Sequence, residues 1–119
     1  MYLVLFVLHN PDYIEELLAD WEKLGVSGVT VLFSTGLGRL RQRKEMREDL
    51  PLMPSLSDFY EAPEDLSRTL FTTVNDHDMV EALLAATRNI VGSLDDPETG
   101  LLLVMPVLEA YGMNKGRKR

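Results

Sequence analysis

The stretch that decides the fold is Asn10-Pro-Asp-Tyr-Ile-Glu-Glu-Leu-Leu-Ala19, because it recurs 66 residues later as Asp76-His-Asp-Met-Val-Glu-Ala-Leu-Leu-Ala85. Each copy follows an apolar run and has the features of a helix start: Asn10 or Asp76 can cap, and acidic side chains stand in the first turn. Apolar residues then repeat at helical spacing in both copies. Each half of the chain is therefore predicted to be a strand that leads into an amphipathic helix.

Four strands are predicted around these two helices, one before and one after each helix. They cover residues 2–8, 29–35, 68–74 and 101–107. The resulting order, βαβ followed by βαβ, predicts an α+β fold of the ferredoxin-like plait type, an antiparallel sheet with two helices on one face. Pro106 has no backbone N–H to donate to a neighbouring strand, which fits the edge position that the fourth strand has in that plait.

The composition favours a single cytoplasmic domain, residues 1–119. A chain of 119 residues, 45% of them hydrophobic, can build one core. There is no cysteine, and the apolar start of the chain is too short to cross a membrane and has no basic residue ahead of it. We therefore expect a protein that is not membrane-inserted. The formal net charge of -7 also argues against nucleic acid as a partner.

The first and fourth strands are apolar on both faces, although the predicted helices cover only one face of the sheet. Exposed apolar patches of this size are rare in monomers. We therefore expect a homo-oligomer in which copies of the chain cover the open face.

A long insertion, residues 36–67, separates the second and third strands, where a plain hairpin needs only about two to five residues. Most of the basic residues stand either in this insertion, between Arg39 and Arg47, or in a basic C-terminal tail, residues 113–119. Such insertions are commonly functional, so we interpret it as a binding loop; a solvated connection without a binding role is the alternative.

The insertion opens with Gly36-Leu37-Gly38-Arg39. Glycines let backbone amides approach an anion, and the arginine can bind phosphate or carboxylate. The pattern lacks the third glycine of a dinucleotide fingerprint and the Gly-Lys-Ser/Thr of a P-loop. A plain turn at the end of the strand is therefore the alternative interpretation.

Two stretches resemble the P-II nitrogen regulatory proteins. Gly25-Val-Ser-Gly-Val-Thr-Val-Leu-Phe-Ser-Thr-Gly36-Leu-Gly-Arg39 is similar to the family's Gly-x-x-Gly-x-Thr strand that leads to Gly-Phe-Gly-Arg, and Gly100-Leu-Leu-Leu-Val-Met-Pro106-Val107 is similar to its last strand. The resemblance implies a homotrimer whose long loop, residues 40–66, contacts a target protein, either a transporter or an enzyme. It also implies a small anionic effector in the clefts between subunits, with an adenine nucleotide as the candidate. The residues that match this ligand site are Thr30, Gly36, Leu37, Gly38, Arg39, Thr73 and Gly100.

The chain departs from the family at positions that bind phosphate. Leu101 replaces the lysine that follows the matched glycine, Leu40 replaces the glutamine after the glycine motif, and Gly112 and Asn114 stand near the places of two arginines. Tyr60 does not match the family's modified tyrosine. Losing three cationic contacts of about 1.5 to 3 kcal/mol each weakens nucleotide binding by orders of magnitude, so the identity of the effector stays open.

Other chemistry has less support in the sequence. His9 and His77 follow the first and third strands and suit capping better than a metal site, and Asp95-Asp96-Pro97-Glu98 lacks the spacing of a calcium loop. Trp21 lies on the apolar helix stripe and is expected in the core. No nucleophile setting is recognisable, so we expect a protein that is not an enzyme. Two alternatives remain open: a trimeric metal-responsive protein of the cation-tolerance type, and a small dimeric α+β barrel enzyme.

Overall fold

The computed structural model describes residues 1–26, 28–37 and 66–113. This part of the chain forms one four-stranded sheet, two main helices and one short 3-10 helix. In chain order the elements are β1 (Tyr2–Leu8), η1 (Pro11–Tyr13), α1 (Ile14–Lys23), β2 (Thr30–Ser34), β3 (Ser67–Val74), α3 (His77–Val91) and β4 (Gly100–Pro106).

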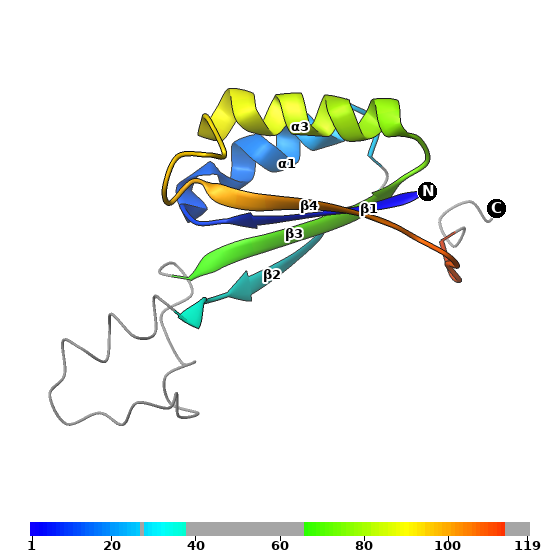
Figure 1. The fold of residues 1–119 in the computed structure, drawn as a ribbon, viewed down its shortest axis with the longest axis horizontal. Helices are drawn as coiled ribbons and strands as arrows, with labels where there is room; N and C mark the ends of the chain where they lie inside the picture. Colours follow the sequence, from blue (N-terminus) through cyan, green and yellow to red (C-terminus); the bar gives the residue numbers. More distant parts are fainter. Residues whose placement is uncertain (27, 38–65, 114–119) are drawn as a thin grey trace, which may run out of the picture.

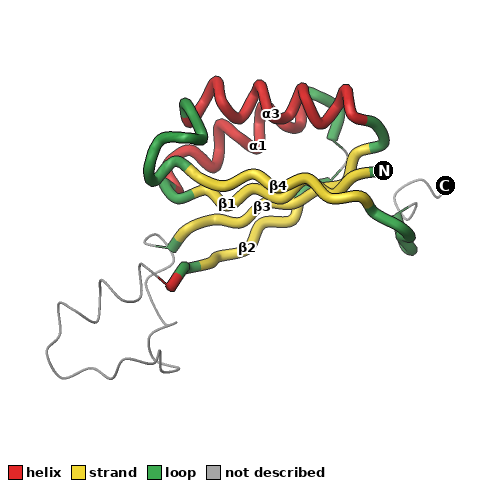
Figure 2. The backbone as a smooth tube through the Cα atoms, in the orientation of Figure 1, coloured by secondary structure: helices red, strands yellow, loops and turns green. Residues whose placement is uncertain are grey.

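The sheet has the strand order β2-β3-β1-β4, and every neighbouring pair is antiparallel. Both helices lie on the same face of this sheet, as Figure 1 shows. The smooth tube in Figure 2 makes the two layers plain, with the helices on one side and all four strands on the other. The prediction of an α+β fold with an antiparallel sheet is confirmed, and β4 is an edge strand, as Pro106 indicated.

The strand predictions hold to within one residue at each end. β1 has the predicted bounds, β2 is one residue shorter at each end, and β3 begins one residue earlier, at Ser67. β4 runs from Gly100 to Pro106 instead of 101–107, because Gly100 still pairs with Leu8 of β1. Beyond Pro106 the backbone N–H of Val107 donates one more hydrogen bond, 3.1 Å long, to the carbonyl oxygen of Met1.

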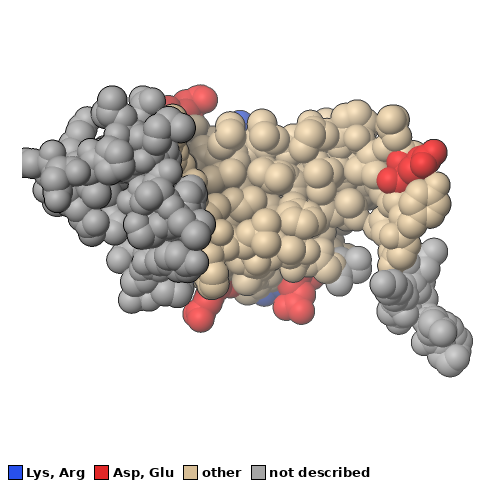
Figure 3. Space-filling view, turned by 90° about the horizontal axis from the view of Figure 1, so that it is seen from below, with Lys and Arg blue, Asp and Glu red and all other residues tan. Residues whose placement is uncertain are grey.

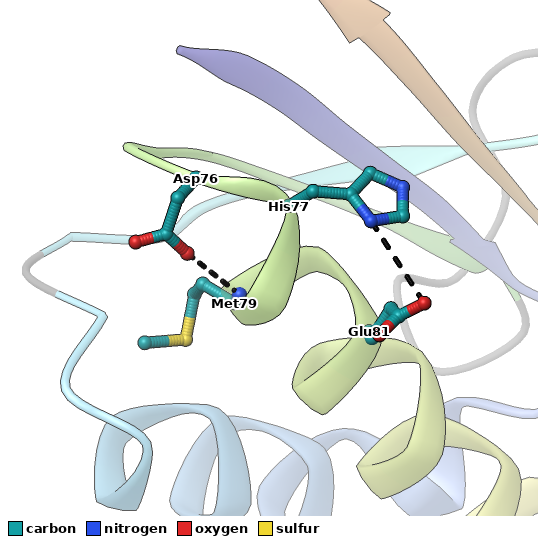
Figure 4. Close-up of polar contacts among 4 residues, drawn as sticks. All are labelled: Asp76, His77, Met79 and Glu81. Atoms are coloured by element: carbon teal, nitrogen blue, oxygen red, sulfur yellow. Dashed lines mark hydrogen bonds and ion pairs between the residues drawn. The ribbon is translucent and has the colours of Figure 1, made fainter.

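Both predicted helix caps form. The Asn10 side chain accepts a 3.0 Å hydrogen bond from the backbone N–H of Asp12, but the first turn is the 3-10 helix η1, so α1 begins only at Ile14. The Asp76 side chain accepts a 2.9 Å hydrogen bond from the backbone N–H of Met79 (Figure 4). Each cap satisfies a donor that the helix start leaves unpaired.

The repeat in the sequence corresponds to an approximate twofold relation in space. β1 and β3 are equivalent in the repeat and pair directly, and at the centre of this pair Leu5 lies opposite Phe71, its own counterpart 66 residues later. In the helix layer the Trp21 indole N–H donates a 3.1 Å hydrogen bond to Thr87 Oγ1, again a pair 66 residues apart. Residues at the same repeat position therefore meet in both layers.

The core lies between the helices and the central strands β1 and β3. Trp21, predicted to be buried, is fully enclosed, as is Thr87. Alternate residues of the strands face the helices, and these residues and the inner helix stripes form one apolar cluster. Its buried members are Val4, Phe6, Leu8, Leu17, Trp21, Leu70, Val74, Val80 and Leu83.

The other face of the sheet, which we call the open face, carries no charged strand residue; it is apolar along β1 and β4 and mixes apolar side chains with serines and threonines along β2 and β3. The register places Leu5 beside Phe71 and Leu103 on this face, with Leu32 and Leu101 toward the edges. Leu32, Leu101 and Leu103 keep 51%, 53% and 43% of their surface exposed. Figure 3 views the molecule from this side; charged side chains lie at the margins of the described part and the middle is uncharged. The apolar face expected from the sequence is present.

The predicted insertion, 36–67, falls between β2 and β3, and its last residue belongs to β3. Its residues 38–65, and residues 114–119 of the basic tail, lie outside the described residues. Within the described ranges no helix has the length and apolar character needed to cross a membrane.

Candidate functional site

The glycine turn predicted to bind an anion stands at the end of edge strand β2. Gly36 and Leu37 follow Ser34 and Thr35 there, while Gly38 and Arg39 lie outside the described residues. A Cβ atom built on Gly36 meets nothing within 4 Å. The packing of the described residues therefore gives no reason for a glycine at this position, and these residues leave room for a ligand to approach it.

Gly100 lies on the opposite edge of the sheet and has a structural reason to be glycine. Its φ is +153°, and a Cβ there would stand 2.5 Å from the carbonyl oxygen of Val7 and 2.6 Å from the Phe6 ring. No side chain fits without moving the backbone of β1. The match of Gly100 to a ligand-binding glycine is thus explained by close strand packing, whether or not it also binds a ligand.

Thr30 and Thr73 lie together at the other end of the sheet. Thr30 begins β2 and pairs with Phe71, two residues before Thr73, so both threonines are on the open face. The hydroxyl of Thr73 is 3.9 Å from the sulfur of Met113, a weak contact. Gly36 is six residue steps along the chain from Thr30, a distance of at most roughly 20 Å.

Within one chain the predicted site residues therefore occupy three separate places. Gly36 and Gly100 are at the same end of the sheet, but β3 and β1 lie between their strands. Three interstrand spacings of about 4.8 Å put roughly 14 Å between the two edges. A single copy of the chain does not bring the predicted site residues that the structure describes into one pocket.

The sheet carries one basic side chain among its described residues, Arg68, which the sequence interpretation did not select. Its guanidinium carbon lies 4.5 Å above the centre of the Phe33 ring, and Nη1 donates a 2.6 Å hydrogen bond to the carbonyl oxygen of Leu66. Phe33 and Arg68 are directly paired in the register, at the same end of the sheet as Gly36. Arg68 therefore places a positive charge near the glycine turn, and its bond to Leu66 uses one of the five guanidinium N–H groups.

A signal for Arg68 was present in the sequence. The other strand residues are apolar, Ser, Thr, Tyr, Gly or Pro, so a lone cation in that setting stands out. The described residues hold twelve acidic and only three basic side chains, and the other two bases, Lys23 and Arg88, are on the helices. An anion approaching the sheet therefore meets one cation in the described region.

Thr35, next to the glycine turn, has a polar atom without a partner among the described residues. Its Oγ1 atom is buried and makes no hydrogen bond within that part of the chain, although the residue as a whole is only partly buried. Buried hydroxyls normally find a partner. This end of β2 thus has an unused hydrogen-bonding group close to the turn.

The two histidines do not form a joint site. His9 follows the end of β1 and His77 follows the end of β3, and these antiparallel strands end at opposite sides of the sheet. His77 Nδ1 is 3.8 Å from Glu81 Oε1, an exposed pair on one helix (Figure 4), and its ring meets Tyr2 edge-on. In the described part of the chain, no group of three histidine, aspartate or glutamate side chains is arranged to hold a metal ion.

The positions where the sequence departs from the P-II pattern show no substitute cation of their own. Leu101 is 53% exposed on the open face, Gly112 has a φ of +92°, and Leu40 and Asn114 lie outside the described residues. Comparison of the chain with protein-family models and with curated proteins finds no match.

Proposed function

We propose that the chain is a P-II-like regulatory protein: a ferredoxin-like plait that assembles as a homotrimer in the cytoplasm and does not catalyse a reaction. A small anionic effector, with an adenine nucleotide as the leading candidate, binds between subunits. The long loop, residues 40–66, contacts a target protein. The strand order β2-β3-β1-β4 with both helices on one face supports the plait, since this is the order that two successive βαβ units give in that fold.

The observation that carries the proposal is the separation of Gly36 from Gly100. They lie on opposite edges of one sheet, at the same end of it. A ligand that needs both must therefore bind where the β2 edge of one copy meets the β4 edge of another. The apolar open face supports the same arrangement, because self-association removes it from water.

Arg68 supplies the charge in this proposal. The phosphate-binding positions of the P-II pattern are occupied by Leu101, Gly112 and Asn114, none of which is cationic. Arg68 lies at the glycine-turn end of β3, and its hydrogen bond to Leu66 uses a single guanidinium nitrogen. A charge-assisted hydrogen bond from this guanidinium contributes about 1.5–3 kcal/mol to anion binding.

Thermal unfolding with ligands tests the proposed function. Adenine nucleotides, orthophosphate, bicarbonate and divalent metal ions are added separately at a fixed protein concentration. A ligand present at 100 times its Kd stabilises the folded state by about 2.7 kcal/mol, which raises the Tm by several degrees. We expect an anion to raise the Tm of the wild-type protein and of the control Arg88→Gln, whose guanidinium lies on α3, but to have little effect on Arg68→Gln.

Four results would contradict the proposal. A stable monomer in light scattering at micromolar concentration removes the intersubunit site, and a stable dimer favours the α+β barrel alternative. Stabilisation by divalent metals alone, unchanged in Arg68→Gln, favours the metal-responsive alternative. If no anion changes the Tm, the glycine turn and Arg68 have no anionic ligand among those tested, and the proposed effector is rejected.

A further inference from the structure

The two halves of the chain alternate within the sheet. We call residues 1–37, which hold β1, α1 and β2, the first half, and residues 66–113, which hold β3, α3 and β4, the second half. In the strand order β2-β3-β1-β4, β3 lies between the two strands of the first half and β1 lies between the two strands of the second half (Figure 1). All three antiparallel strand pairs of this sheet therefore join one half to the other.

Each half depends on the other for the backbone hydrogen bonds of its strands. A strand needs a neighbour for its N–H and C=O groups, and in the described sheet that neighbour always belongs to the other half. One half alone has a helix and two strands that are not adjacent in the sheet. Because chains of about 40 residues rarely fold alone without disulfides or metal ions, we expect neither half to fold by itself.

The hydrophobic core is shared between the halves in the same way. The two helices contact each other over the central strands, and both halves contribute to the one apolar cluster. The first half supplies Val4, Phe6, Leu8, Leu17 and Trp21, and the second half supplies Leu70, Val74, Val80 and Leu83. The boundary between the halves therefore passes through the centre of the core, as the interface of an obligate complex does.

Side-chain hydrogen bonds also cross this boundary, in addition to the indole bond in the helix layer. The hydroxyl groups of Ser34 and Thr69 are 2.8 Å apart, and the Thr72 hydroxyl donates to the carbonyl oxygen of Gly28. Thr72 is only 4% exposed, so its hydroxyl would lose a buried acceptor if the halves separated. These directional bonds make the contact between the halves specific as well as apolar.

The covalent connection joins two strand ends that the contact between the halves already holds together. β2 ends at Ser34 and β3 begins at Ser67, and these two residues are paired in the register. Residues 35–66 therefore connect positions that are neighbours in the sheet. Their covalent link raises the local concentration of one half near the other, but the strand pairs form without it.

We infer that each half is the binding partner of the other, and that the sheet and its helices stay assembled when the chain is cut within residues 38–65. A covalent link gives two pieces an effective concentration on the order of 1 mM, so at about 10 μM of each separate piece the folded-to-unfolded ratio falls about a hundredfold. Small domains have ratios of about 10³–10⁸, which leaves the cut protein assembled. The inference goes beyond the proposed function and does not depend on it: a cut there changes the segment proposed to contact a target and leaves the sheet in place.

Site-specific cleavage of the full chain tests the inference. The recognition sequence of a site-specific protease is inserted within residues 38–65, and the protein is compared before and after cutting by gel filtration and circular dichroism. We expect the two pieces to elute together and the spectrum to stay unchanged. Two variants with the recognition sequence at different points of this segment keep the test decisive if one of them does not fold.

Recombination of the separated pieces gives a second readout. Trp21 is the only tryptophan and lies in the N-terminal piece, so its fluorescence reports when that piece becomes buried against the other. The pieces are separated in urea and diluted singly or together. We expect each piece alone to lack the native spectrum, and the C-terminal piece to restore the native Trp21 emission with saturation at one to one.

Matched variants of the C-terminal piece show whether the contact between the halves drives recombination. Leu83→Ala removes a fully buried side chain at the boundary and should weaken recombination at least about 30-fold. Asn89→Ala changes an exposed position of the same helix and should stay within about threefold of wild type. Separation of the pieces on the column after cutting overturns the inference, and so does a native spectrum from either piece alone or an equal effect of the two substitutions.

Discussion

Replacing Thr87 by valine is expected to destabilise the fold through one lost hydrogen-bond acceptor. The Thr87 hydroxyl accepts a 3.1 Å bond from the Trp21 indole N–H and donates a 2.7 Å bond to the carbonyl oxygen of Leu83. Trp21 and Thr87 are both fully buried. Valine keeps the shape of threonine but cannot accept, so the indole N–H is left without a partner in the core.

The expected cost follows from that orphaned donor. A buried donor left unsatisfied costs about 1–3 kcal/mol. The Leu83 carbonyl also loses the Thr87 hydroxyl, but it lies within α3 and keeps a helix N–H as its partner, so this loss adds little to the cost. For a domain of this size, Thr87→Val should lower the Tm by about 4–12 °C. Thr87→Ser keeps the hydroxyl and loses one methyl group, at about 0.5–1.5 kcal/mol.

Urea unfolding followed by circular dichroism measures these differences, at one fixed protein concentration because an oligomer's stability depends on it. Trp21→Phe removes the donor itself, so the cost of Thr87→Val should shrink by about 1 kcal/mol or more in that background. A Thr87→Val protein within about 0.5 kcal/mol of wild type, or one with an equal loss in both backgrounds, would refute the reasoning.

Three further predictions concern other parts of the fold. Gly100→Ala should lower stability by several kcal/mol because its Cβ would overlap the neighbouring strand, whereas Gly36→Ala, with nothing within 4 Å of its Cβ, should stay within about 0.5 kcal/mol; chemical unfolding of both checks this. Asp76→Ala removes the cap on the Met79 N–H and should lower the free energy of unfolding by about 1 kcal/mol. Asp76→Asn keeps a capping oxygen and should retain most of the wild-type stability in thermal melts. Leu5→Lys puts a charge at the centre of the open face and should lower the mass measured by light scattering; an unchanged oligomer with a normal Tm would show that this face is not the contact.

The fold could be predicted from the sequence because its signals are local and occur twice. The cap and acidic first turn at Asn10 recur at Asp76, so local sequence alone predicts both helix starts, and both caps form. The one local difference, the 3-10 turn before α1, arises where Pro11 opens the helix. The short apolar run that stops at His9 predicted the bounds of β1, and the other strands were predicted to within one residue.

The candidate site was harder to predict because its geometry depends on strand order. Gly36 and Gly100 match one ligand site in the sequence, yet the order β2-β3-β1-β4 puts them on opposite edges. Gly100 also shows that a motif glycine can be required by packing alone. Arg68 was missed because its relation to Phe33 and the glycine turn exists only once β2 and β3 pair.

The meeting of equivalent residues at Leu5–Phe71 and Trp21–Thr87 limits how alike the two halves of the chain can become. These pairs lie at the approximate twofold axis that relates the two halves, so each residue contacts its own counterpart there. Identical halves would therefore place two indoles, or two threonines, in a space that holds one of each. A protein assembled from two copies of the first half would crowd its centre and lose the acceptor for its indole N–H. Divergence at these positions is therefore a packing requirement of the folded chain.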